Sequence, residues 1–341
     1  MTLNDRSRNI LNAVIVSYIR TAAPVGSRSI TKVFDFGLSP ASIRNVMADL
    51  EDLGFLAQPH TSAGRVPTEK AFRMYVESLI DTLPGTDSGE LIDHNFLGTV
   101  ETPQKMLQEA SRLLSDLSHY AGLVLAPNAA NTSFERIEVI RLRHDHVLVL
   151  LVSADGLIYN RVIAIEDDFS DADLVRVNSI LNEQFRGFDL QEIRSRLLEQ
   201  MRAHKREYDT LLARALELGQ KAIAGQPETE VYLGGASNIL DLPEFADADR
   251  MKGIFRAFEE KARMVTLLNK CLESDGVQVY IGSDNAFSGL EGCSLVISSY
   301  KKGNHAIGSL GVIGPMRMNY DKVIPLVDQT ARAVSRLMEQ E

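Results

Sequence analysis

Residues 24–67 read PVGSRSITKVFDFGLSPASIRNVMADLEDLGFLAQPHTSAGRVP, a stretch that predicts two short helices joined by a tight turn and followed by a small polar hairpin. This is the outline of a winged helix-turn-helix. In that architecture one helix enters the major groove of DNA, and the hairpin lies along the neighbouring backbone. The sequence therefore indicates a DNA-binding regulator whose N-terminal domain covers residues 1–82.

The second of these helices is predicted over residues 40–53, and both of its ends are marked. Ser39 suits the N-cap, and Pro40 suits the first helical position, where the missing N–H has no partner to lose. Gly54 can adopt the left-handed conformation that ends a helix. Between these ends, apolar residues recur every three or four positions and form one inward-facing stripe. The stripe consists of Ile43, Val46, Met47, Leu50 and Leu53.

The opposite face of this helix carries the side chains that we expect to read bases. Arg44 can bind guanine and Asn45 can bind adenine, each through two hydrogen bonds, while a small residue such as Ala41 lets the backbone approach. The far end of the helix is acidic and would repel phosphates, so the N-terminal half should enter the groove. The residues assigned to this contact are Ser39, Ala41, Ser42, Arg44 and Asn45.

The helix predicted over residues 27–34 is expected to contact the phosphate backbone. It begins with Ser27, Arg28 and Ser29, and hydroxyls, a guanidinium and free N–H groups at a helix start suit a phosphate. The alternative is that these residues only cap a short helix. The helix predicted before it, over residues 5–21, shows a packing stripe and is expected to be core.

The polar turn after residue 56 has the composition of a DNA-binding wing. Its candidate contacts are His60, Thr61, Ser62, Gly64 and Arg65, with Gly64 allowing close backbone approach and Arg65 supplying charge at the tip. The alternative is an ordinary surface loop of similar polarity. Lys70 and Arg73, on the following helix, either extend the contact or are solvated.

The charge distribution agrees with DNA binding at the N-terminus. The 341-residue chain has a formal net charge of −10, yet residues 1–80 hold nine Lys and Arg against seven Asp and Glu. Because basic charge is local to the motif, the acidic remainder should discourage indiscriminate DNA coating. A hydrophobic content of 45% predicts a globular protein of two or three domains. The longest apolar run, residues 147–152, is only of strand length, so we expect a cytoplasmic protein without a membrane partner.

Residues beyond the first domain alternate between helical and strand-like segments. A linker is predicted over residues 83–102, where Pro, Gly and turn formers replace helical periodicity. A helix from residue 103 then leads into four strand-like runs, and three more strands follow residue 276 before a final helix over 321–338. This predicts an antiparallel sheet in two parts, 103–188 and 274–341, so that strands before residue 165 pair with strands after 276.

The segment between the two sheet parts, residues 189–273, is mainly helical. Its apolar residues alternate four- and three-residue steps, which is typical of a coiled-coil seam. That seam could pack inside its own domain or against a second subunit. The residues assigned to it as dimerisation contacts are Leu197, Met201, Tyr208, Leu211 and Leu218.

Patterns that would indicate an enzyme are weak. His144 and His146 have no third ligand nearby, which favours a solvated hairpin tip over a metal site. The run GSLGVIGP at 308–315 lacks the spacing of a nucleotide-binding loop, and its glycines better suit a bulge or turn. Cys271 and Cys293 are expected to be buried thiols. We therefore predict no enzymatic activity, no metal and no cofactor.

Three strings make the N-terminal region more specific: PVGSRSI, LSPASIRNVMADLEDLGFL and HTSAGRVPTEKAFRMYVESL. They resemble the start of the bacterial heat-inducible transcription repressor family, HrcA. Later segments, ERIEVIRL, VYLGG and SLGVIGPMRMNY, also resemble that family, so the likeness extends along the whole chain.

The resemblance implies a homodimeric repressor that binds an inverted-repeat operator ahead of chaperone operons and needs the chaperonin to stay active. It also implies an α+β multidomain fold, in which a GAF-like antiparallel sheet domain is interrupted by the inserted helical dimerisation domain. A different function stays open: a small-molecule-responsive winged-helix regulator with a ligand pocket in the GAF-like domain.

Overall fold

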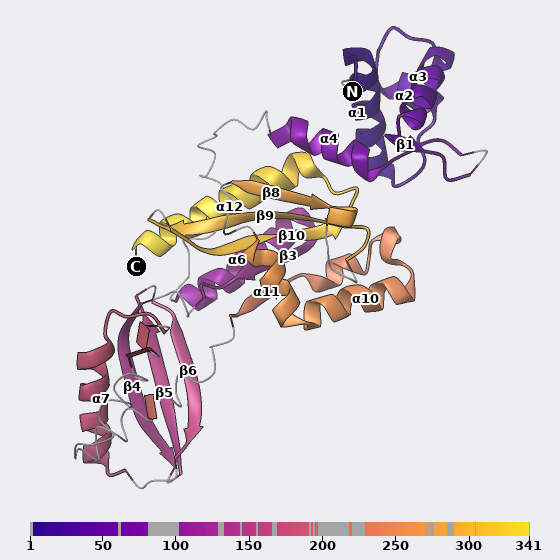
Figure 1. Ribbon diagram of the computed structural model, residues 1–341. Coiled ribbons are helices and arrows are strands. Elements are labelled where there is room, and N and C mark those ends of the chain that lie inside the picture. The colour runs from indigo at the N-terminus through magenta and orange to yellow at the C-terminus, as the bar shows by residue number, and fades with distance from the viewer. Residues whose placement is uncertain are drawn as a thin grey trace.

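Figure 1 shows a computed structural model of the chain, in which three units follow one another in space. A helical N-terminal domain and a small three-stranded sheet lie at opposite ends, with a five-stranded sheet between them. None of the described helices combines the length and the apolar character that a membrane crossing needs. The structure describes residues 3–60, 63–80, 102–128, 133–143, 145–154, 156–165, 169–190, 192–193, 195–196, 218–219, 229–270, 272, 276–284, 290–303 and 305–340.

The N-terminal domain has the predicted order of a winged helix-turn-helix. Its elements are α1 (Asp5–Thr21), α2 (Ser27–Val33), α3 (Pro40–Asp52), β1 (Leu56–Ala57), β2 (Val66–Pro67) and α4 (Glu69–Ile80). The predicted stripe of α3 forms core, because Ile43, Met47 and Leu50 are buried together with Ile10 and Leu11 of α1. Each of the first three helices begins where the sequence placed it and ends within one residue of the predicted end.

The predicted end signals of α3 act as expected. The Ser39 hydroxyl accepts a hydrogen bond from the Ser42 N–H at 3.1 Å. Gly54 has a φ of +76°, and the next N–H, of Phe55, returns to the Leu50 carbonyl at 2.9 Å. The backbone therefore turns sharply out of α3 into the wing.

The central unit is an antiparallel sheet of five strands with helices on both faces (Figure 1). Its strand order is β7-β3-β10-β9-β8. Side chains of alternate strand residues pack against α6 and α12 on one face and against α10 and α11 on the other. The bounds are β3 (Ala121–Leu125), β7 (Val231–Gly234), β8 (Val277–Ile281), β9 (Cys293–Lys302), β10 (His305–Pro315), α6 (Pro103–Ser118), α10 (Ala248–Glu259), α11 (Lys261–Asn269) and α12 (Tyr320–Gln340), with short 3₁₀ turns at Ala236–Ile239, Pro243–Phe245 and Gly282–Asp284.

The prediction that strands on both sides of residue 165 share one sheet is wrong for three of the four early strands. Only β3 pairs with the late strands, lying between β7 and β10. Strands β4 (Phe134–Arg143), β5 (His146–Ser153) and β6 (Ile158–Ala164) form their own antiparallel sheet, which α7 (Asp171–Phe185) covers. Short turns join these three strands, so each pairs with its neighbour in sequence, and strand-like alternation alone cannot distinguish the two outcomes.

Residues 231–269, which were expected to belong to the inserted helical segment, instead contribute to the five-stranded sheet and its cover. Strand β7 has only four residues, too few for alternation to be recognised among helical patterns. Of the predicted seam, Leu218 is buried in the core of the three-stranded unit, whereas Leu197, Met201, Tyr208 and Leu211 lie outside the described residues. We infer that the inserted unit begins near β4 and ends before β7.

Helix α4 joins the N-terminal domain to the five-stranded unit. The Tyr75 hydroxyl lies 3.0 Å from both carboxylate oxygens of Asp321, at the start of α12. The Glu69 carboxylate accepts a hydrogen bond from the Ser283 hydroxyl at 2.6 Å. One hydrophobic cluster continues across this junction, so the two units share buried surface as well as polar contacts.

The residues considered as possible signs of an enzyme are two histidines, a glycine-rich run and two cysteines. His146 Nδ1 lies 2.8 Å from Asp145, and His144 is outside the described residues. Gly308 lies where the register of β10 shifts, and a Cβ there would collide with the Tyr300 hydroxyl. Cys293 is buried, and that burial raises the pKa of its thiol to about 12. Cys271 is outside the described residues.

Candidate DNA-binding surface

The predicted base-reading face of α3 is open to solvent. Ala41, Arg44 and Asn45 are exposed, while Val46 and Met47 beside them are buried. Within the described part of the chain, neither the Arg44 nor the Asn45 side chain has a hydrogen-bond or ion-pair partner. Both are therefore free to form two hydrogen bonds with a base edge.

Ser39 and Ser42, also predicted to contact DNA, bond to each other. Their hydroxyl oxygens lie 3.0 Å apart, and the Ser39 hydroxyl also caps the helix. A hydroxyl can donate one hydrogen bond and accept two, so capacity for a phosphate oxygen remains at this helix start. The cap also fixes the first turn of α3, which holds Ala41 at the solvent-facing end.

The start of α2 resolves one alternative left by the sequence. The N-cap position is Gly26, and no side chain forms a capping hydrogen bond there. Ser27 is half-buried, whereas Arg28 and Ser29 are exposed. Capping therefore does not account for these three side chains, and contact with a phosphate remains as their predicted role.

The wing differs from its prediction in the place of Arg65. Its backbone N–H and carbonyl pair with Val25, at 2.9 and 2.8 Å, so it lies at the base of the wing and not at the tip. Its guanidinium lies 2.7 Å from the Glu51 carboxylate, and only 21% of the side chain is exposed. The base of the wing therefore packs against the acidic end of α3. Local residue types do not predict this contact.

Of the other predicted wing residues, the structure describes Gly64 and His60. Gly64 packs its backbone on residue 25, and a Cβ there would collide with the Val25 carbonyl. Its predicted close approach is therefore to the protein itself. His60 is exposed on the polar turn, and Thr61 and Ser62 lie outside the described residues.

Lys70 and Arg73 have partners inside the protein. The Lys70 ammonium donates to the Leu53 carbonyl at 2.9 Å and lies 4.3 Å from the centre of the Phe55 ring. It thus caps the end of α3. Arg73 donates to Ser283 at 3.1 Å, toward the five-stranded unit. Lys70 is nevertheless exposed and the Arg73 side chain is 40% exposed, so both charges also meet solvent.

Two exposed arginines lie outside the predicted set of DNA contacts. Arg6 and Arg8 lie in the first turns of α1 and are exposed. Both belong to the basic excess of residues 1–80, whereas the apolar spacing of α1 predicted only its buried side. Long-range attraction from such side chains adds to phosphate binding without reading sequence.

The chain matches two family models that together cover most of its length. Residues 2–79 match "Winged helix-turn-helix transcription repressor, HrcA DNA-binding", and residues 104–324 match "HrcA protein C terminal domain". It is 47% identical to the heat-inducible transcription repressor HrcA of Geobacter sulfurreducens, over 99% of both chains. It is 42% identical to that of Syntrophobacter fumaroxidans, over 99% of this chain and 98% of the relative.

A solved structure supports the whole-chain fold. It is described as a hypothetical protein at 2.2 Å resolution, and it aligns with a TM-score of 0.69 and 23% identity over 99% of both chains. At that identity the likeness concerns the arrangement of the three units.

Proposed function

The chain belongs to the HrcA family of heat-inducible transcription repressors, and on this basis we propose that it binds an inverted-repeat operator ahead of chaperone operons as a homodimer. The observation that carries the proposal is the free, exposed pair Arg44 and Asn45 on the face of α3 opposite its buried stripe. The family is one of repressors and not of enzymes. Since a repressor acts where the DNA lies, we place the protein in the cytoplasm.

The proposed DNA contacts fall into three groups. Arg44, Asn45 and Ala41 read base edges, because they lie on the open side of a capped helix. The α2 start, the α3 hydroxyls and the wing tip position the domain on phosphates. Arg65 positions the wing through Glu51 and Val25. The phosphate group comprises Ser27, Arg28, Ser29, Ser39, Ser42, His60, Thr61 and Ser62, with Gly64 and Arg65 shaping the wing.

The proposed dimer interface lies on the three-stranded sheet. Its inner face packs on α7, but its outer face carries a row of apolar side chains with little cover. Ile140, Leu148 and Val162 lie side by side across the three strands, and Ile140 and Val162 are 42% and 54% exposed. A contiguous apolar patch of this kind on a folded domain marks an interaction site. A second copy of the same face fits it, because a two-fold axis matches one apolar surface with itself.

Of the predicted helical seam, the structure describes only Leu218. Leu218 is buried within its own unit, which supports the internal alternative for that position. Our proposed dimer surface is therefore the apolar part of the outer sheet face, beside the Arg136–Glu138 ion pair and Asn160 on the same face. It consists of Ile140, Leu142, Leu148, Leu150, Val152, Ile158 and Val162. A two-fold dimer pairs naturally with an inverted repeat, whose half-sites should be centred near a multiple of about 10–10.5 bp apart.

We also propose that chaperonin maintains the repressor. The topology supports this, because β3 lies between β7 and β10 in the five-stranded sheet and both partners come from far later in the chain. Such long-range pairings form slowly and leave apolar strands such as β3 uncovered in the meantime. During heat shock, other unfolded proteins occupy the chaperonin, so repression would lapse until capacity recovers.

Transcript profiling of a strain that lacks this protein tests the proposed function. We expect increased transcripts confined to chaperone operons, and footprinting with purified protein should protect an inverted repeat ahead of them. Unchanged chaperone transcripts would refute the repressor role.

For the chaperonin step, protein inactivated by mild warming should regain operator binding with chaperonin, its co-chaperonin and ATP. Complete refolding from denaturant alone, at the same rate and yield, would remove that step and leave the DNA-binding proposal intact.

A further inference from the structure

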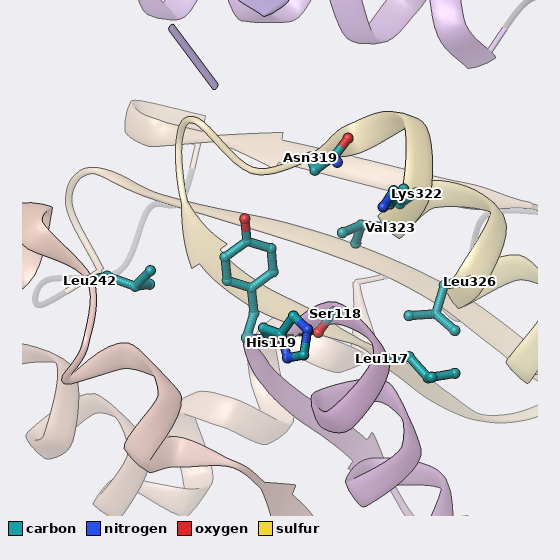
Figure 2. A pocket seen from close by; sticks show the side chains of 9 residues that line it. Leu117, Ser118, His119, Leu242, Asn319, Lys322, Val323 and Leu326 are labelled. Atoms are coloured by element: carbon teal, nitrogen blue, oxygen red, sulfur yellow. Dashed lines mark hydrogen bonds between the residues drawn. The ribbon is translucent and has the colours of Figure 1, made fainter. Parts of the chain in front are cut away.

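A cavity of about 440 Å³ lies between the end of α6 and the start of α12 (Figure 2). Its polar lining comes from Ser118, His119, Tyr120, Asn319 and Lys322, and its apolar lining comes mainly from leucines and valine on the two helices. Figure 2 shows these side chains arranged around one space, with Leu242 at the left and Leu326 at the right. The size falls within the range of pockets for small molecules.

The charges around this cavity favour an anion. His119 and Lys322 are exposed cationic or potentially cationic residues, and neither side chain has an ion-pair partner in the described part of the chain. No carboxylate is among the described lining residues. Two acidic groups of the surrounding segments have partners of their own, because Glu244 pairs with Arg317 and Asp321 accepts from Tyr75. The first turn of the 21-residue helix α12 adds its positive end to the same space.

We propose that this cavity binds a small anionic molecule, through carboxylate or phosphate oxygens, and couples its binding to the DNA-binding domain. The leucine and valine side chains of the lining would cover the apolar part of such a molecule, while Lys322, His119 and Asn319 hold its charged end. Backbone at the end of α6 is fixed locally, since the Ser118 hydroxyl accepts from the Tyr120 N–H at 3.1 Å.

The proposed coupling runs through residues 317–322, which contact both the cavity and the N-terminal domain. Asn319 and Lys322 line the cavity, whereas Asp321 between them holds Tyr75 of α4. Arg317 donates to the Ile19 carbonyl of α1 at 3.3 Å. A shift of this turn on ligand binding would thus move the contacts that orient the N-terminal domain. This half of the proposal rests on the proposed operator binding, and the cavity half does not.

Calorimetry on the full chain without DNA tests the cavity. Sodium phosphate and sodium succinate, at constant ionic strength, are the two anionic probes, and erythritol is the neutral one. We expect saturable binding of one anion per chain and none of erythritol, with the stronger probe identifying phosphate or carboxylate chemistry. Lys322→Met and His119→Asn should each weaken it by about tenfold or more, since each removes a side chain that would hold the anion. Asparagine tolerates the left-handed backbone at position 119, where φ is +61°.

Arg44→Met is the matched control, because it removes a free cation from the DNA-facing surface. It should leave anion binding unchanged. No saturable binding of either anion, equal binding of erythritol, or loss in Arg44→Met with retention in Lys322→Met would overturn the cavity site.

The coupling is tested by operator affinity with and without saturating anion at fixed ionic strength. By linkage, the anion should change operator affinity by the same factor by which operator changes anion affinity. In Lys322→Met, the anion should no longer change operator affinity, so the factor should equal one. In Tyr75→Phe, the anion should still bind, but the factor should lie closer to one than in the wild type. Unchanged operator affinity in the presence of bound anion would refute the coupling but not the cavity.

Discussion

The side-chain amide of Asn178 pairs with the backbone of Val139 as a neighbouring strand would. Its Oδ1 accepts from the Val139 N–H at 2.7 Å, and its Nδ2 donates to the Val139 carbonyl at 3.1 Å. One turn later in α7, Asn182 repeats the pattern with Ile137, at 2.9 and 2.7 Å. Two asparagines thus satisfy the outer edge of β4 and close it to further strands.

Asn178→Leu and Asn182→Leu should each destabilise the three-stranded unit. Each change leaves a partly buried N–H and carbonyl of β4 without partners, which costs about 1–3 kcal/mol. Urea unfolding measures the loss in the free energy of unfolding. Ser179→Ala is the control and should have little effect, because Ser179 is exposed and its hydroxyl donates to the Val175 carbonyl of the same helix. Equal stability of the leucine variants and the control would mean that water satisfies this edge.

Arg44→Ala and Asn45→Ala should each reduce discrimination between operator and scrambled DNA. Each bidentate base contact is worth about 1–3 kcal/mol, specifically on the operator. Arg28→Ala should instead weaken binding to every sequence and lower the slope of log affinity against log salt by about one. Fluorescence anisotropy on both DNAs across salt concentrations separates the two effects. If the folded Arg44 and Asn45 variants keep the wild-type preference, the recognition face is wrongly assigned.

Arg65 and Glu51 should act together on the wing. If Arg65 only holds the wing, Arg65→Ala and Glu51→Gln both weaken DNA binding, because each removes one half of the same ion pair. The salt slope should then change little. If Arg65 instead contacts a phosphate, Arg65→Ala lowers the slope by about one unit, and Glu51→Gln frees the guanidinium and preserves or strengthens binding. Opposite responses of the two variants would therefore contradict the positioning role.

Charge on the outer sheet face should dissociate the dimer. Ile140→Glu combined with Val162→Glu places like charges in the centre of the proposed interface, where burial without partners is costly. Sedimentation should show a folded monomer. Val175→Glu is the matched control, because Val175 is 66% exposed on α7, away from that face. Leu218→Asp should destabilise the unit itself, since Leu218 is buried in its core. A dimer that survives both outer-face changes would place the interface elsewhere.

Removing the Tyr75 hydroxyl should change stability at high pH. Burial, with a further contribution from Asp321, raises the pKa of Tyr75 in the folded state. A folded-state pKa above the unfolded value of about 10 means that this group's stabilisation is present below pH 10 and is lost as pH rises beyond it. Above pH 10, the free energy of unfolding of Tyr75→Phe should therefore fall less steeply with pH than that of the wild type. An identical pH dependence would show that Tyr75 ionises freely.

Local signals predicted the N-terminal domain well. Ser39, Pro40 and Gly54 act on neighbouring residues to fix the ends of α3. The local sequence is therefore enough to predict this helix. The prediction failed where partners are distant. The pairing of Arg65 with Glu51 depends on how the wing folds back, and the pairing of β3 with β10 depends on a chain path across the whole molecule. No residue type near either position encodes its partner.

The pairing of β3 with β7 gives the inserted unit an unexpected topological status. Leu125 lies opposite Val231, and the Ala126 N–H donates to the Glu230 carbonyl at 2.9 Å, so both ends of the insert leave from one strand pair. For the five-stranded sheet, the entire insert is then the loop of a β-hairpin. Closing a flexible loop of about 100 residues costs only about 2.5 kcal/mol more than closing one of about six. The sheet can thus carry the insert, exchange it for another or lose it, with its own strand order unchanged.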